Sequence, residues 1–148
     1  MRVAILMGSD KDMPKMQAAA DLLAEFGVDH DVHVMSAHRT PERVATFATG
    51  ARDGGYGVII CGAGKAAHLA GAVAAHSTLP VIGVPIAAGG MGGLDALLST
   101  VQMPTGIPVA TVAVDSAANA AYLAMAILAA TDPGLAGKLD VYREGLKG

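Results

Sequence analysis

The stretch Val58-Ile59-Ile60-Cys61 holds four consecutive apolar residues, three of them β-branched, and Gly62 follows directly. Continuous apolar runs of this length are typical of strands in a parallel sheet, where helices cover both faces. Similar runs occupy residues 2–7 and 81–84. The three runs therefore predict buried central strands rather than half-exposed antiparallel ones.

Segments with helical spacing separate these runs. In residues 13–26 apolar side chains recur every three or four positions, and Gly27 ends the pattern. Pro41, directly behind Thr40, is typical of a first helical position with its cap. The full prediction alternates strands at residues 2–7, 28–34, 58–61, 81–84 and 109–114 with helices at residues 13–26, 41–53, 66–76, 93–102, 116–130 and 134–146.

This alternation predicts an α/β fold. Strand–helix–strand units join parallel strands by right-handed crossovers, and helices on both faces produce a three-layer sandwich. Five strands fit the flavodoxin-like order 2-1-3-4-5, in which the ligand cleft lies at the carboxyl ends of strands one and three. The sequence contains no internal repeat or linker, so we expect a single domain over residues 1–148.

Composition excludes several classes of protein. The chain is 53% hydrophobic and 16% charged, which excludes disorder, and its net charge of −3 argues against nucleic-acid or anionic-membrane partners. It has no tryptophan and a single cysteine, Cys61, so neither an internal disulfide nor a cysteine-based zinc site is available. With no apolar leader segment, these features predict a cytoplasmic protein.

The charges are distributed unevenly along the chain. Asp95 and Asp115 are the only charged residues between residues 66 and 131. Prolines and glycines interrupt this stretch, which excludes a membrane span. Its helices nevertheless lack a charged face toward solvent, so we expect much of this half to lie against other subunits.

Polar residues concentrate in the loops that follow the first three strands, at residues 8–12, 36–41 and 62–68. Each loop leads into a helix whose free backbone N–H groups favour an anion. Arg39 and Ser9 suit a phosphate group, and Asp12 suits sugar hydroxyls. The three loops therefore predict a site for a phosphorylated sugar.

Each residue also has a simpler interpretation. Ser9, Asp10 and Asp12 suit helix caps and first-turn acids, and Arg39 suits a solvent-exposed charge. His68 falls on an apolar helix face, where core or interface histidines are common. Two related classes fit poorly. A phospho-receiver needs an aspartate where Cys61 and Gly62 stand, and a flavin-binding electron carrier needs stacking aromatics where only Tyr56 is available.

The segment Ser36-Ala37-His38-Arg39-Thr40-Pro41 resembles the signature of the N5-carboxyaminoimidazole ribonucleotide mutase family of purine biosynthesis. The resemblance extends over residues 2–130, with further matching motifs at residues 7–12, 62–69, 79–85 and 95–104. It implies a flavodoxin-like subunit in a homo-octamer that binds a ribonucleotide and uses neither a metal nor an organic cofactor.

The resemblance also implies roles for individual residues. His38 is the expected acid/base catalyst. The remaining expected contacts to the substrate are Ser9, Asp10, Asp12, Ser36, Arg39, Gly64, Lys65, Ala66 and His68. Ser9, Asp12 and Arg39 are expected at the ribonucleotide, and Ser36, Gly64, Ala66 and His68 around its carboxylate.

Three possible functions remain open. The first is a mutase that moves the carboxylate of N5-carboxyaminoimidazole ribonucleotide from nitrogen to C4, by decarboxylation and recapture of CO2. The second is direct carboxylation of aminoimidazole ribonucleotide by CO2, and the third is a non-catalytic nucleotide-binding module. The residues Ala66-Ala67-His68-Leu69 favour the mutase, whereas Lys65 replaces the usual glycine of that family. Ala70 in place of a proline and a short segment at 114–117 are further departures.

Overall fold

The computed structural model describes residues 1–148 and contains one sheet of five parallel strands in the order β2-β1-β3-β4-β5. The strands are β1 (Arg2–Met7), β2 (His30–Val34), β3 (Tyr56–Gly64), β4 (Val81–Ile86) and β5 (Ala110–Thr111). The predicted fold class and strand order are confirmed.

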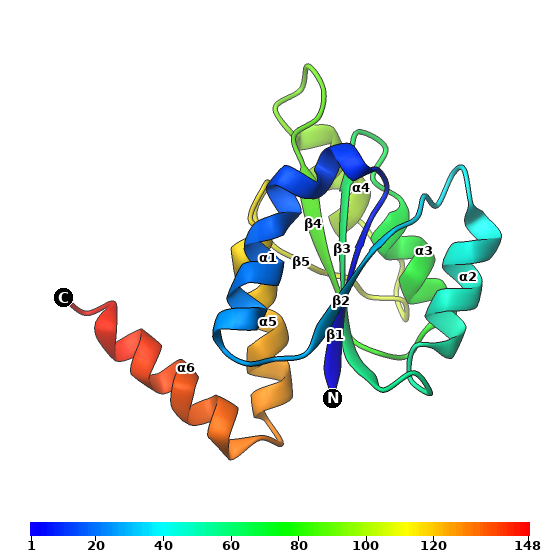
Figure 1. The fold of residues 1–148 in the computed structure, drawn as a ribbon. Coiled ribbons are helices and arrows are strands. Elements are labelled where there is room, and N and C mark those ends of the chain that lie inside the picture. The colour runs from blue at the N-terminus through cyan, green and yellow to red at the C-terminus, as the bar shows by residue number, and fades with distance from the viewer.

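Helices cover both faces of the sheet, as Figure 1 shows. The helical elements are the 3-10 turn η1 (Asp10–Asp12), α1 (Met13–Glu25), α2 (Pro41–Gly50), α3 (Leu69–His76), α4 (Leu94–Val101), α5 (Ala117–Ala129) and α6 (Pro133–Gly145). Helices α1 and α5 pack together on one face, and α2 and α3 on the other. Helix α6 extends outward from α5 and carries the C-terminus away from the sheet (Figure 1).

The alternation of β3 explains the two-sided core. Val58 and Ile60 are buried with α1 and α5, whereas Ile59 and Cys61 are buried with α2 and α3. Because successive side chains of a strand point to opposite faces, both faces must be apolar when both are covered. The apolar run that predicted this strand is the direct result. Burial also raises the pKa of the Cys61 thiol, since no partner stabilises a thiolate there.

Several predicted boundaries were wrong. Strand β3 continues to Gly64, where it still pairs with Ile86, so part of the expected third loop is strand. The expected fifth strand at residues 109–114 is reduced to Ala110–Thr111, which pair with Ile82 and Gly83 of β4 at the edge of the sheet. Helix α3 begins at Leu69 rather than at residue 66: Lys65 has a left-handed φ of 54°, and a tight turn follows in which the N–H of His68 donates to the carbonyl of Ala66. Helix α2 ends at Gly50, short of residue 53.

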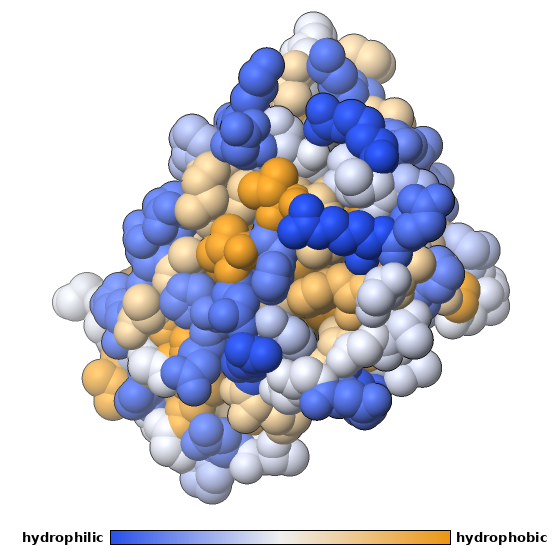
Figure 2. Space-filling model, turned by 45° about the vertical axis from the view of Figure 1, so that its right-hand side comes forward, coloured by the Kyte–Doolittle hydropathy of each residue, from blue (hydrophilic) through white to orange (hydrophobic).

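The surface retains apolar side chains. Figure 2 shows a face on which hydrophobic residues lie between strongly hydrophilic ones. Along α4 and the loop before it, Met91, Leu94, Leu98 and Val101 are between 43% and 61% exposed. None of the helices combines the length and the hydropathy that a membrane span requires.

Candidate active site

The loops after β1, β2 and β3 enclose a cavity of about 710 Å³ at the carboxyl edge of the sheet. Parallel strands bring these loops together because all the strands end at the same edge. The cavity is lined by Gly8, Ser9, Lys11, Asp12, Ser36, Ala37, His38, Arg39, Ala63, Gly64, Lys65, Ala66, His68, Leu69 and Ala88.

Two histidines meet at this cavity. Nε2 of His38 and Nδ1 of His68 lie 2.6 Å apart in a hydrogen bond, with the rings nearly perpendicular at 82°. One ring must donate and the other accept, so a single proton lies between them when both are neutral. Both side chains are exposed toward the cavity. Residues 30 positions apart in the sequence therefore form one proton-handling pair.

The loop of His38 is held in shape by its own side chains. The backbone N–H of Ser36 donates to Oγ1 of Thr40, and that hydroxyl donates to the carbonyl of Ser36. The backbone N–H of Arg39 donates to Oγ of Ser36. Such local side-chain bonds favour a turn over continued strand, which explains why β2 ends here.

Arg39 connects two of the loops. Its Nη2 donates to the carbonyl of Gly8 over 2.8 Å, so the guanidinium lies at the end of β1. The guanidinium makes only this one bond to the protein, and its remaining N–H groups are available for a bidentate contact with two oxygens of an anion. This geometry suits a phosphate held between Arg39 and the first turn of the helical region.

The first loop forms the adjoining wall. Oγ of Ser9 accepts from the backbone N–H of Lys11 over 3.2 Å and caps the turn η1. The backbone N–H of Asp12 donates to the carbonyl of Ser9. Burial raises the pKa of Asp12, and the Ser9 backbone, Lys15 and Arg39 offset only part of this effect. Asp12 is thus a half-buried carboxylate directed at the cavity.

The third loop contributes the most constrained residues. A Cβ on Gly64 would lie 2.6 Å from Cβ of Ala88, so only glycine fits where these backbones meet. Lys65 has φ of 54°, a conformation that costs a non-glycine residue about 1 kcal/mol or more. Its carbonyl accepts from Oγ of Ser99 over 3.3 Å, and its ammonium has no partner among the side chains.

Nine of the ten predicted site residues line this cavity, and Asp10 does not. The Asp10 carboxylate instead accepts from Oγ of Ser9 at the outer side of η1. The prediction omitted six lining residues, namely Gly8, Lys11, Ala37, Ala63, Leu69 and Ala88. Lys11 stands in a loop that the sequence singles out, whereas Ala88 carries no polar signal. No three His, Cys, Asp or Glu side chains gather in a geometry that could hold a metal ion.

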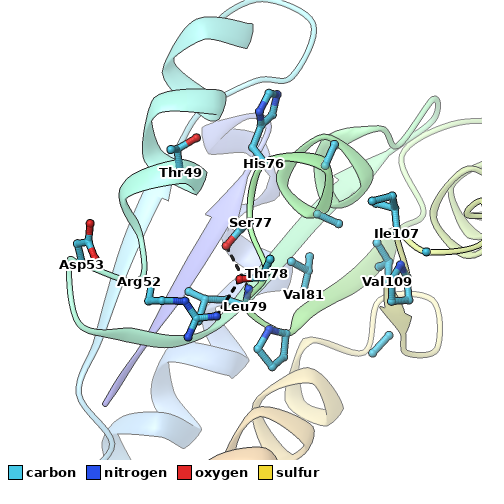
Figure 3. A pocket seen from close by; sticks show the side chains of 16 residues that line it. Thr49, Arg52, Asp53, His76, Ser77, Thr78, Leu79, Val81, Ile107 and Val109 are labelled. Carbon is cyan, nitrogen blue, oxygen red and sulfur yellow. Dashed lines mark hydrogen bonds between the residues drawn. The ribbon is translucent and has the colours of Figure 1, made fainter.

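A second, larger cavity of about 1060 Å³ lies at the opposite edge of the sheet, near the amino ends of β4 and β5. Figure 3 shows its wall, where Nη2 of Arg52 donates to Oγ1 of Thr78 over 2.9 Å. His76 and Asp53 also line it, but they make no contact with each other. The polar groups of this cavity do not converge.

Comparison with known proteins relates the chain to one family. The chain is 52% identical to N5-carboxyaminoimidazole ribonucleotide mutase of Thermotoga maritima, over 99% of this chain and 85% of that protein. It is 50% identical to the chloroplastic phosphoribosylaminoimidazole carboxylase of Vigna aconitifolia, over 98% of this chain and 26% of that longer protein.

The fold comparison agrees with the sequence comparison. The crystal structure of Treponema denticola PurE superposes with a TM-score of 0.87 at 30% identity, covering 98% of this chain and 90% of that one. The sequence pattern of the AIR carboxylase family matches residues 2–148. The chain therefore belongs to the AIR carboxylase family.

Proposed function

We propose that this protein is an N5-carboxyaminoimidazole ribonucleotide mutase, an isomerase of purine biosynthesis that transfers a carboxylate from nitrogen to C4. The contact between His38 and His68 carries the proposal, because it supplies a proton donor and acceptor inside a cavity with phosphate-binding character. The name and the 52% identity of the Thermotoga relative support the same reaction.

The ribonucleotide phosphate binds between Arg39 and the loop of Ser9. The free guanidinium N–H groups and the Ser9 hydroxyl are the donors, and Lys11 adds a cation at the rim. Asp12 accepts from the ribose hydroxyls. The base then lies toward His38 and His68, which line the same cavity.

The reaction proceeds in two steps. The N–CO2 bond of the carbamate breaks, CO2 is released into the pocket, and the nitrogen takes a proton. The nucleophilic C4 then attacks CO2, and the C4 proton leaves to restore the aromatic ring. His38, in contact with His68, gives and takes these protons, since an imidazole serves as acid and base near neutral pH.

Recapture of CO2 depends on confinement. When CO2 stays beside C4, the second step is effectively unimolecular, an advantage of about 7–11 kcal/mol for well-oriented partners. Ala63, Gly64 and Ala66 form a wall without polar side chains next to His68. This small apolar region suits an uncharged, linear molecule.

Direct carboxylation of aminoimidazole ribonucleotide is the second candidate. The unpaired ammonium of Lys65 lines the cavity and favours this alternative, because it could attract bicarbonate or a forming carboxylate. The plant relative carries the name of a carboxylase. Lys65 lines the same cavity as the histidine pair, and all three residues are exposed.

One isotope experiment separates the two reactions. The purified protein is supplied with fresh N5-carboxyaminoimidazole ribonucleotide in labelled bicarbonate. A mutase delivers mostly unlabelled carboxylate to C4, because CO2 is recaptured before it escapes. Product labelled to the level of the bulk bicarbonate, with aminoimidazole ribonucleotide accepted at least as well, would identify a carboxylase. Binding without turnover of either substrate would leave the non-catalytic module.

We further propose that the protein assembles as a homo-octamer. The exposed apolar residues of α4 and the shortage of charge between residues 66 and 131 support an assembled state. Light scattering at low micromolar concentration is expected to give about eight times the chain mass of 14.8 kDa. Replacing both Leu94 and Leu98 by glutamate is expected to lower that mass. A monodisperse wild-type monomer would refute the proposal.

A further inference from the structure

The loop between β4 and α4, residues 87–93, holds four glycines and reaches the active-site cavity through Ala88. In Figure 1 it rises highest at the carboxyl edge of the sheet. Gly92 and Gly93 have φ of 62° and 88°, in the left-handed region. Such a loop has many accessible conformations, so something must hold Ala88 in place.

The ion pair of Lys15 and Asp115 binds the backbone of Ala87, the first residue of this loop. Nζ of Lys15 on α1 donates to the carbonyl of Ala87 over 2.8 Å and to Oδ2 of Asp115 over 2.7 Å. Oδ1 of Asp115 accepts from the backbone N–H of Ala87 over 2.9 Å. Both backbone polar groups of Ala87 are thus held by the same pair of side chains.

Asp115 is itself fixed by its backbone. Its N–H donates to the carbonyl of Pro85 over 2.8 Å, and its φ of 58° lies in the left-handed region, which aspartate and asparagine tolerate better than most other non-glycine residues. Burial alone would raise the pKa of Asp115, but hydrogen bonds from Lys15 and the Ala87 N–H outweigh it and lower the pKa. The carboxylate is therefore ionised and engaged at neutral pH.

Asp95 and Asp115 are also notable for where they lie in the chain. The only two charged residues between residues 66 and 131 both lie beside this loop. Asp115 holds its beginning. Near its middle, the Cβ position of Gly89 is 3.7 Å from Cε of Lys65 and 3.8 Å from Oδ2 of Asp95. Because both charged residues of this charge-poor segment lie beside the loop, we infer that they keep the loop ordered.

The held residue lies next to the reacting region. Ala88 follows Ala87 directly, and its Cβ fills the space that a side chain on Gly64 would need. Ala88 and Gly64 line the cavity together with His68. A shift of Ala88 would therefore open the small apolar wall where CO2 is expected during the proposed reaction.

We propose that Lys15 and Asp115 are positioning residues that hold Ala88 in the cavity wall and so prevent CO2 from escaping before recapture. The CO2 part of this inference rests on the proposed mutase function. The positioning of the loop by Lys15 and Asp115 does not depend on that function. Loop positioning and CO2 retention are therefore measured separately.

The test uses Lys15→Met and Asp115→Asn in the full chain. Asparagine keeps the left-handed backbone and an acceptor for the Ala87 N–H, but it loses the charge that holds Lys15. Each variant is assayed for the fraction of substrate released as aminoimidazole ribonucleotide instead of carboxylated product. We expect this fraction to rise about threefold to tenfold in Lys15→Met, with KM within about twofold, because small misplacements of a site wall cost turnover before binding.

Hydrogen exchange of the Ala87 amide, which donates to Oδ1 of Asp115, measures the base of the loop directly. Exchange is expected to accelerate about tenfold in Lys15→Met and less in Asp115→Asn. The double variant should exchange no faster than Lys15→Met, because both substitutions break the same ion pair. Lys15→Arg, which keeps a donor at this position, is expected to restore most of the wild-type product ratio.

The chain offers a matched control. Nη1 of Arg2 and Oδ2 of Asp31 lie 2.6 Å apart with side-chain exposures of 41% and 38%, close to the 39% and 37% of Lys15 and Asp115. This second pair lies at the amino edge of the sheet, away from the loop. Arg2→Met should lower stability without changing the product ratio or the exchange of the Ala87 amide.

Two results would overturn the inference. Unchanged loop exchange in Lys15→Met would show that the pair does not position the loop. Faster exchange with an unchanged product ratio would show that Ala88 does not retain CO2. If the wild-type protein fails to convert the substrate, the proposed function is refuted, and the exchange measurement still decides whether the pair positions the loop.

Discussion

Two cavities of this protein lie at opposite edges of one sheet and differ in what surrounds them. The amino-edge cavity has about 1060 Å³ and the carboxyl-edge cavity about 710 Å³. The larger one lies beside the C-terminal end of α3, where free carbonyls disfavour anions. The smaller one receives the loops that lead into η1, α2 and α3, where free N–H groups favour them.

The histidines illustrate the same difference. His76 ends α3 at the larger cavity and makes no side-chain hydrogen bond, whereas His38 and His68 are paired at the smaller one. Arg52 is bound to a neutral hydroxyl, and Arg39 keeps most of its N–H groups free. Strand direction and convergence of polar groups, rather than volume, thus identify the site.

The largest expected effect comes from the histidines. His38→Asn is expected to lower turnover about 10²- to 10⁴-fold while substrate affinity stays within a few-fold, because a positioned acid/base is lost and the phosphate contacts remain. His76→Asn at the other cavity should leave turnover unchanged. Single-turnover kinetics measure the first quantity and calorimetric titration the second. Near wild-type turnover in His38→Asn would remove His38 from the mechanism.

The arginines come next in size. Arg39→Ala is expected to weaken ribonucleotide binding about ten- to a hundredfold, since a charge-assisted contact to phosphate contributes about 1.5–3 kcal/mol. Arg52→Ala should bind as the wild type does. Titration with the ribonucleotide and with inorganic phosphate checks both variants. Equal affinity in Arg39→Ala and wild type would move the phosphate site elsewhere.

A smaller effect is expected at Lys65. Lys65→Gly is expected to keep a mutase within about threefold of wild-type activity and to leave stability equal or about 1 kcal/mol higher, because glycine accepts the left-handed φ without strain. Gly64→Ala, one position earlier, should instead lose activity and stability through its clash with Ala88. Collapse of activity in Lys65→Gly would favour direct carboxylation.

The smallest effect concerns the pH dependence of stability. Because burial raises the pKa of Asp12 above its ordinary value of 3.8, its stabilising contribution is present below that value and is lost as pH rises through the folded pKa. Asp12→Asn should therefore gain stability relative to wild type between about pH 3 and pH 7. Partial solvation limits the gain to less than about 1 kcal/mol.

The pKa of Asp115 is lowered, so its effect on the pH dependence of stability is expected to have the opposite sign to that of Asp12. Its contribution is present above the ordinary value and is lost as pH falls through the folded pKa. Asp115→Asn should lose stability relative to wild type at neutral pH. Urea unfolding of both variants across this range measures the two slopes, and equal signs would contradict the assignment.

Much of the fold could be predicted because burial on both faces leaves a direct mark in the sequence. The apolar runs of β1, β3 and β4 reflect the two cores that they join. Strand β5 was overestimated because its apolar residues at 109–114 resemble a buried strand, although the sheet extends it for only two residues. An edge strand needs only one partner, and the sequence does not state where that pairing stops.

The sequence by itself determined the strand order, the three polar loops and nine of the residues that line the cavity. The strand–helix alternation and the polar loops follow from local periodicity and residue chemistry, whereas the strand order follows from the fit to a flavodoxin-like fold and the roles of most lining residues from the family resemblance. Only the tertiary structure decided that His38 and His68 share a hydrogen bond, that Asp10 turns away, and that Lys15 and Asp115 hold Ala87. Lys15 and Asp115 lie 100 positions apart, and their contact exists only because helix α1 packs beside α5 across the same face of the sheet.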